Sequence, residues 1–491
     1  MLGHTSISLI SFANDCYIIM SDYGIKINEI CIFSYCAQEG NKLQMKDEFR
    51  DKILKLALPI TAQQFMLALV SACDAFMLGG LNQNSLSAVS LASQITFIFN
   101  LILAALIIGE NMFVAQYFGK KDFAGVRVMT GLVLTYVLWV SGFFLIITLC
   151  IPKLLMQLFT NDAMLIEYGM RYLQLIGLSY VFSGVLQVLQ VILKNCGGAG
   201  KCTMVSIVVV CTNIVLNVIL IYGYLGFPRM EIAGAALATV IANGIGLVIT
   251  IHMLRPKGEL WIGIADIKCR TKNITKKFWK HVYPVLFNEI VWGGGFTMYS
   301  VILGHLGSDA VAANSIANIT KNLLICACTG FGYGGSIIIG NLLGEGNLSE
   351  ARKSGNVLCK IAVISGCLTG TVLLLLIPVI LHVSRLTDAA MGYLKYMLLM
   401  SSYYVIGKSV NSMTIGGIFP AGGDTKFGLK CDAATMWCFA VPLGYIVAFA
   451  LKLPVLMVYF VLNLDELVKL PAVFMHYRKY KWLKNLTEME N

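Results

Sequence analysis

The two halves of this 491-residue chain repeat each other at a constant spacing of 225 positions. Four landmarks keep this spacing: Pro59 and Pro284, LGGL at 78–81 and LGHL at 303–306, QYFGKKDFAGVR from Gln116 and NLLGEGNLSEAR from Asn341, and GGAGK from Gly197 and GGDTK from Gly422. Almost everything between these landmarks is apolar. A tandem duplication of an apolar unit is typical of transporters, which move a substrate between two halves.

The composition places the chain in a membrane. It is 57% hydrophobic and 13% charged, whereas about 25% of the residues in soluble domains are charged. Many apolar runs reach the roughly 20 residues that a helix needs to span a bilayer. These runs do not alternate with polar residues as the strands of a membrane β-barrel do. The sequence therefore predicts an all-α integral membrane protein.

The pattern of apolar spans predicts twelve transmembrane helices in two six-helix repeats. A basic polar connection, 255–280, separates an N-terminal lobe, 45–254, from a C-terminal lobe, 281–476, which a tail of residues 477–491 follows. The twelve spans are about 53–78, 92–118, 128–151, 172–194, 203–225, 232–254, 281–304, 314–342, 357–382, 393–419, 431–451 and 454–476.

The distribution of lysine and arginine predicts the orientation. If the N-terminus is inside, the linker 255–280 and the other inside connections hold most of the basic residues. The outside connections hold few: Lys153, Arg229, Arg385 and Lys452. This positive-inside bias predicts a multi-pass protein of the inner (plasma) membrane with both termini and the linker cytoplasmic, and two parallel repeats. The same bias explains the net charge of +11 without a nucleic-acid partner.

The first 44 residues do not fit the rest of the chain. They lack the basic start of a signal peptide, and Asp15 and Asp22 interrupt their apolar stretch. From Met45 the chain reads MKDEFRDKILKLALP, a natural inside start that leads into a first helix. We interpret residues 1–44 as an extension from a wrongly assigned start or as a disordered segment, and a genuine N-terminal segment is the alternative.

Carboxyl groups inside apolar spans are the strongest functional candidates. Asp74 lies in the first span, Glu110 in the second, Glu289 near the start of the seventh and Asp432 at the start of the eleventh. Such a group costs about 2.5–3.5 kcal/mol on insertion scales, so it usually faces a cavity and has a function. In a hydrated cavity it can bind and release H⁺ or Na⁺. The alternative is a carboxyl that caps a helix or forms an ion pair, and this alternative is serious for Asp432.

Amide side chains occur in the same spans. Gln63 and Gln64 lie in the first span, and Asn213 and Asn217 lie four residues apart in the fifth, on one helix face. Such amides coordinate an ion or form hydrogen bonds between helices, and the sequence leaves both roles open.

The repeats share a scaffold but not their charges. Asp74 corresponds to Tyr299, and Glu289 corresponds to Gln64. Two different cation sites, one in each half, are therefore compatible with the sequence.

Matching prolines predict hinges in the first helix of each repeat. Pro59 and Pro284 occupy corresponding positions, and a proline inside a helix leaves a carbonyl free and permits a kink. The sequence has no catalytic triad, no metal-ligand spacing and no phosphate-binding loop, so we expect no enzyme activity and no cofactor.

Several segments resemble the multidrug and toxic compound extrusion (MATE) family of its bacterial type. They are LPITAQQF, DAFMLGGL, AQYFGKKDFAGVR, NIVLNVILIYGYLG, IAGAALATVIAN, PVLFNEIVWGGG, IGNLLGEGNLSEAR and AGGDTKFGLKCDAATMWCFAVPLG. The resemblance runs from about Met45 to the C-terminal tail, in the family's order. It implies a V-shaped transporter with two six-helix lobes, which exports organic, often cationic, compounds in exchange for H⁺ or Na⁺.

The resemblance also implies roles for individual residues. Asp74 matches the acid of the family's first helix, and Asn213 and Thr239 match polar partners around it. Asn217 stands where one branch of the family has a second acid, and this substitution leaves the N-lobe cation site one carboxylate short.

In the C-terminal lobe, Glu289 resembles the acid of the family's seventh helix. An acid that some members carry in the tenth helix has no counterpart near Ser409, and Asp432 partly substitutes for it. We assign five polar or aromatic residues to the substrate cavity: Gln63, Gln64, Asn288, Trp292 and Tyr299.

The sequence thus predicts a monomeric antiporter that exports small cationic or amphipathic molecules by alternating access. One alternative is a flippase for lipid-linked oligosaccharides, or an exporter of specialised metabolites, from the same superfamily. Few basic residues lie inside the spans, mainly Lys321 and Lys408, which disfavours pyrophosphate binding. A membrane transferase is less favoured, because the six histidines are dispersed along the sequence and form no recognisable pair there with acids.

Overall fold

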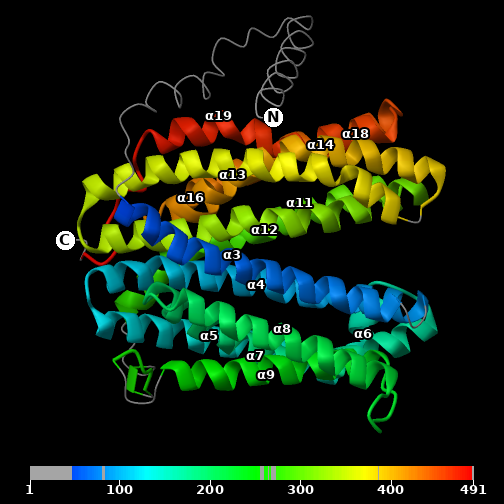
Figure 1. Cartoon of the computed structure of the whole chain (residues 1–491), viewed down its shortest axis with the longest axis horizontal. Coiled ribbons are helices and arrows are strands. Elements are labelled where there is room, and N and C mark those ends of the chain that lie inside the picture. Colours follow the sequence, from blue (N-terminus) through cyan, green and yellow to red (C-terminus); the bar gives the residue numbers. More distant parts are fainter. Residues whose placement is uncertain are drawn as a thin grey trace, which may run out of the picture. The chain divides into compact units, whose positions relative to one another are not determined.

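The computed structural model describes residues 47–79, 83–254, 259–263, 265–266, 272–384 and 386–488. The segment 1–44, which we expected to be an extension, lies outside the described residues, and so does part of the linker 255–280. All regular elements in the described part are helices (Figure 1). The first half contains α3 (Asp47–Gly79), α4 (Gln83–Gly119), α5 (Phe123–Cys150), α6 (Pro152–Gln157), α7 (Ala163–Asn195), α8 (Ala199–Tyr222) and α9 (Ile232–Leu254).

The second half is also helical but more interrupted. It contains α11 (Lys272–Gly304), α12 (Ser308–Gly344), α13 (Leu348–Val383), α14 (Asp388–Met413), η2 (Thr414–Ile418), α15 (Phe419–Ala421), α16 (Thr425–Asp432), η3 (Ala433–Ala440), α17 (Val441–Tyr445), η4 (Ile446–Ala450), α18 (Val455–Leu462) and α19 (Asp465–Tyr477). The segments η2, η3 and η4 are π-helical.

The sequence repeat is reproduced in the helix boundaries. α4 and α12 both start and end 225 residues apart, and so do α3 and α11. The side chains that cap the helices also correspond. Asp122 accepts a hydrogen bond from the first turn of α5, and Asn347 does the same for α13; Asp162 and Thr387 cap α7 and α14. Because a cap fixes where a helix starts, these pairs keep the two halves in register.

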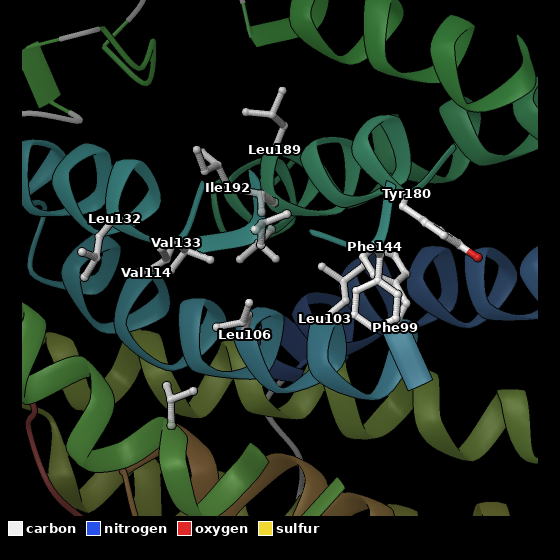
Figure 2. Close-up of a cluster of buried hydrophobic side chains, with 14 of the residues drawn as sticks. Phe99, Leu103, Leu106, Val114, Leu132, Val133, Phe144, Tyr180, Leu189 and Ile192 are labelled. Atoms are coloured by element: carbon white, nitrogen blue, oxygen red, sulfur yellow. The ribbon is translucent and has the colours of Figure 1, made fainter. Parts of the chain in front are cut away.

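A buried apolar cluster holds the first half together. Figure 2 shows its centre, where Phe99 of α4, Phe144 of α5 and Tyr180 of α7 lie close to one another. The ring of Phe99 is 5.4 Å from that of Phe144 and 4.6 Å from that of Tyr180. Large apolar side chains also lie on the outside, for example Trp139, which is 75% exposed, and Leu375, which is 71% exposed. Water would disfavour such an exterior, and lipid chains suit it.

α4 and α12 form the main contact between the two halves (Figure 1). Asn111 donates a hydrogen bond to Ser336, its counterpart 225 residues later, at 3.1 Å. A methyl group at Gly119 would overlap the carbonyl oxygen of Asn341, and one at Gly344 would overlap that of Gln116. Gly119 corresponds to Gly344 in the repeat, and Gln116 corresponds to Asn341. The two close contacts are therefore equivalent, and each half contributes the corresponding surface to the contact between the halves.

Nine helices in the described part are long and apolar enough to cross a membrane. The expected spans at 281–304, 393–419 and 454–476 are not among them. The last is not one helix, because a turn at 463–464 separates α18 from α19. These three segments carry most of the charged side chains described next, and those charges lower their hydropathy.

The C-terminal tail packs onto both halves. Trp482 is fully buried, and its ring lies 5.4 Å from that of Tyr477. Leu486 joins the apolar cluster of the first half. Gln116 of α4 donates to the carbonyl oxygens of Ala421 at 2.7 Å and Lys484 at 3.1 Å, and its own carbonyl oxygen accepts the backbone N–H of Leu486.

Candidate functional site

A chain of hydrogen bonds joins the four polar residues predicted for the cation site of the first half. Asn217 Nδ2 lies 2.5 Å from Asp74 Oδ1 and 3.1 Å from Asn213 Oδ1. Asn213 donates to Thr239 Oγ1 at 3.2 Å. These residues come from α3, α8 and α9, and the spacing of four along α8 brings both asparagines to one face.

The environment of Asp74 suits an exchangeable cation. Within the described ranges, no lysine or arginine forms a salt bridge with its carboxylate, and Asn217 is its hydrogen-bond donor. Asn217 Oδ1 is buried and has no hydrogen-bond partner in the part of the chain that the structure describes. A carboxylate beside an unused amide oxygen can take up H⁺ or Na⁺.

The predicted glutamine pair of α3 divides between two environments. Gln63 is buried and donates to Gln190 Oε1 of α7 at 2.7 Å. Gln64 is half-buried. Neither residue lines the cavity of the second half. The hydrogen bond of Gln63 joins α3 to α7.

The second half contains a cavity of about 380 Å³. Its wall comes from α11, α12, α14, η2, α16 and α19, with Phe97 and Ile108 of α4. Four predicted residues line it: Asn288, Glu289, Trp292 and Asp432. Tyr299 lines a smaller cavity that shares Trp292 with the first. The structure thus brings these five residues to two neighbouring cavities, apart from the Asp74 chain.

Glu289 is the acid of the cavity wall that has no ion pair among the described residues. Its side chain is on the cavity wall, and no salt bridge to it occurs among the described residues. Next to it, Asn288 Oδ1 is buried without a hydrogen-bond partner within the described ranges, and so is the hydroxyl of Tyr299. Unpaired polar atoms in a cavity indicate a wall that receives ligand or water.

Asp432 belongs to a buried ionic network. Lys469 Nζ lies 2.8 Å from Asp432 Oδ1 and 3.4 Å from both Asp465 Oδ2 and Glu466 Oε1. Lys408 Nζ lies 3.1 Å from Glu466 Oε1. Asp432 is thus held in an ion pair, the alternative that the sequence had left open.

Sequence reasoning missed Asp465, Glu466 and Lys469. The sequence predicts one apolar span over 454–476, and the average hydropathy of this span hides its three charges. Three ionisable residues at positions i, i+1 and i+4 of an expected membrane span could have indicated the network, because this spacing places the first and last on one helix face. Lys469 also adds a third basic residue to Lys321 and Lys408 on the cavity wall, so this wall carries more basic residues than expected from the sequence.

The two predicted hinge prolines lie inside continuous helices. Pro59 is within α3 and Pro284 is within α11. Thr203 of α8 donates its hydroxyl to the carbonyl oxygen of Pro59 at 2.6 Å. This bond ties the first helix to α8, the helix that carries Asn213 and Asn217.

Comparisons with known proteins identify the family and the fold of the chain. The MatE family model matches residues 59–222 and again residues 284–446, so its two copies start 225 residues apart. The probable multidrug resistance protein NorM of Thermotoga maritima is 22% identical and covers 89% of this chain and 94% of its own length. The uncharacterized transporter YisQ of Bacillus subtilis is 21% identical, and the match covers 88% of this chain and 95% of YisQ.

The fold also matches a solved structure. A crystal structure of MATE in complex with MaL6 has a TM-score of 0.80 at 19% identity, and the match covers 88% of this chain and 96% of the other. Members of the matched family are transporters rather than enzymes. Because the family model matches more than half of the chain, this multi-pass membrane protein belongs to the MatE family of transporters.

Proposed function

We propose that this protein is a secondary active exporter of small organic molecules, driven by the entry of H⁺ or Na⁺. The observation that carries the proposal is the Asp74–Asn217–Asn213–Thr239 chain of the first half. Its carboxylate forms no salt bridge with a lysine or arginine of the described residues. The cavity of about 380 Å³ beside Glu289 supports the substrate part, because drug-sized ligands occupy pockets of about 300–1,000 Å³. The names of the similar proteins, which include multidrug resistance, agree with this function.

The mechanism follows from competition between ion and substrate. In an outward-open state, H⁺ or Na⁺ binds at Asp74 or Glu289, and substrate leaves because its affinity falls. The ion is then released on the inside and the carboxylate is ready again. Ion and substrate must each differ in affinity between the two states, since otherwise nothing couples them.

We further propose the architecture in which this cycle operates. Twelve helices form two parallel six-helix lobes, 45–254 and 281–476, in the plasma membrane, with linker, tail and both termini in the cytoplasm and the protein as a monomer. The constant offset between matching helices supports two equivalent repeats. Pro59 and Pro284 permit the first helix of each repeat to bend.

A flippase of the same superfamily is the main alternative, and the three lysines of the cavity are the observation in its favour. Two of them are already bound to carboxylates of the same wall. The cavity also has the volume for a drug-sized molecule, whereas a lipid-linked oligosaccharide is far larger. We therefore favour export of small molecules.

Ethidium efflux from energised cells tests the proposal. We expect efflux to collapse either with a protonophore or on removal of Na⁺, which identifies the ion. Asp74→Asn should abolish efflux with expression unchanged, because the amide cannot carry the charge. Unchanged efflux in that variant, together with loss in Glu289→Gln, would move the coupling site to the second half. Efflux that resists both ion treatments would reject antiport.

A further inference from the structure

Lys321 is a buried cation that has no carboxylate partner among the described residues. Its side chain is 6% exposed and lines both cavities of the second half. The salt bridges of this region use the other two lysines of the wall, Lys408 and Lys469. No salt bridge within 4.0 Å involves Lys321 in the described ranges.

Neutral groups hold the Lys321 ammonium in place. It donates to Asn463 Oδ1 at 3.2 Å and lies 4.8 Å and 5.5 Å from the ring centres of Tyr404 and Tyr459. Asn463 uses its NH₂ group to bond the carbonyl oxygen of Tyr459 at 2.8 Å, which turns its oxygen towards Lys321. Since an ammonium has three N–H donors, two are available to a molecule in the cavity.

The repeat shows that the fold does not require a cation here. The matching residue in the first half, 225 positions earlier, is Thr96, whose hydroxyl lies 3.0 Å from that of Tyr180. α4 and α12, which carry the two residues, have matching bounds. A buried charge without a counter-charge is costly, so its presence in only one half indicates a function in ligand binding.

We propose that Lys321 binds an anionic group, such as a carboxylate, of the exported molecule, and that the preferred substrates are aromatic molecules bearing this group. This inference rests on the proposed export function. Trp292, Phe296 and Tyr404 of the cavity wall offer faces for the aromatic body. Glu289, the acid of the wall without an ion pair in the described part, suits a cationic group of the same molecule. The fitting substrate class is therefore zwitterionic.

The dyes rhodamine 110 and rhodamine 123 test this, because they differ only in a carboxylate that rhodamine 123 carries as its methyl ester. Binding to the purified full chain in detergent is measured by fluorescence polarisation. We expect the wild type to bind rhodamine 110 about tenfold more tightly, as a charge-assisted hydrogen bond gives. Lys321→Gln should remove this preference and leave rhodamine 123 binding unchanged. Lys321→Arg should retain it.

Lys395→Gln is the matched control, because Lys395 is an exposed lysine of α14 outside the cavity. Equal or weaker binding of rhodamine 110 by the wild type, or an intact preference in Lys321→Gln, would overturn the proposal. If Lys321→Gln fails to fold, the affinities of the wild-type protein for the two dyes still test the proposal. No ion gradient is present, so this result is independent of whether efflux is coupled to H⁺ or Na⁺.

Discussion

Asp74 and Glu466 show two environments of a carboxylate that lies among packed helices. Glu466 is buried, contacts two ammonium groups and accepts a hydrogen bond from Asn411 at 2.6 Å. Asp74 has one amide donor and no ion pair in the described part. Fixed ion pairs resist a change of charge, whereas a lightly held carboxylate can change its bound cation. At the residue scale, Asp74 is thus suited to coupling and Glu466 to structure.

The Asn217 side chain should control the cation at Asp74. Asn217→Leu removes the donor at 2.5 Å, and a hydrogen bond to a charged group contributes about 1.5–3 kcal/mol. We expect the coupled efflux rate in proteoliposomes to fall at least about tenfold. Asn243→Leu on α9 is the control, because Asn243 donates only to the Thr239 carbonyl in the described part. Equal losses in both variants would contradict a specific role of Asn217.

The buried ammonium of Lys469 should be necessary for stability. Lys469→Met leaves Asp432, Asp465 and Glu466 without their shared cation, and breaking a buried ion pair costs about 3–5 kcal/mol. We expect a large decrease of the melting temperature in detergent, partly restored by adding Asp432→Asn. Lys395→Met, at an exposed site, should leave the melting temperature unchanged. A stable Lys469→Met protein would show that the network is not structural.

Asp74, Asn213 and Asn217 were recognisable as polar residues inside apolar runs, and the family resemblance added Thr239. Asp74, Asn213, Asn217 and Thr239 are far apart in the chain, and the structure joins them by hydrogen bonds. The network around Lys469 was missed because its three charges lie within 454–476, a segment that average hydropathy treats as one apolar span. Whether a carboxylate forms an ion pair depends on which helices pack against it in the folded protein, and the sequence alone does not show this.

At the scale of elements, the crossing of α4 and α12 should tolerate no side chain at its glycines. Gly119→Ala and Gly344→Ala each place a methyl group against a backbone carbonyl of the other helix, and overpacking costs about 1–3 kcal/mol. We expect both variants to lower the melting temperature by similar amounts, because the two contacts are equivalent under the repeat.

Gly142→Ala on α5 is the control for these variants. A methyl group at Gly142 has no neighbour within 4 Å, and alanine in a helix is favoured over glycine by about 0.5–1 kcal/mol. The melting temperature of this variant should stay equal or rise. A Gly119→Ala protein as stable as Gly142→Ala would show that α4 and α12 do not approach this closely.

The helices of the first half were more predictable than those of the second. The expected span 232–254 coincides with α9, whereas 393–419 runs through α14 into π-helical η2 and 454–476 divides into α18 and α19. π-Helical turns occur frequently at functional sites, and η2 contributes Ile415 and Gly416 to the cavity wall. Hydropathy alone does not reveal such turns, because the side chains stay apolar.

At the scale of the whole molecule, one scaffold supports two different sites. α3 and α4 share their bounds with α11 and α12, and α5 and α13 share their N-cap position. Yet the first half holds the Asp74 chain and the second holds a cavity with paired and unpaired charges. A duplicated scaffold can thus assign ion binding and substrate binding to different halves. The C-terminal tail then connects these halves through Gln116.

The last prediction concerns that connection. Gln116→Ala removes bonds to Ala421, Lys484 and Leu486, each of which contributes about 1 kcal/mol. We expect trypsin to cleave after Lys484 at least about tenfold faster, because cleavage follows the population of the released tail. Asn341→Ala, at the corresponding position of α12, has no side-chain bond to the described tail and should leave cleavage unchanged. Equal cleavage in wild type and Gln116→Ala would show that apolar packing of Trp482 and Leu486 is sufficient to hold the tail. The hydrogen bonds of the Gln116 side chain would then be unnecessary for connecting the two halves through the tail.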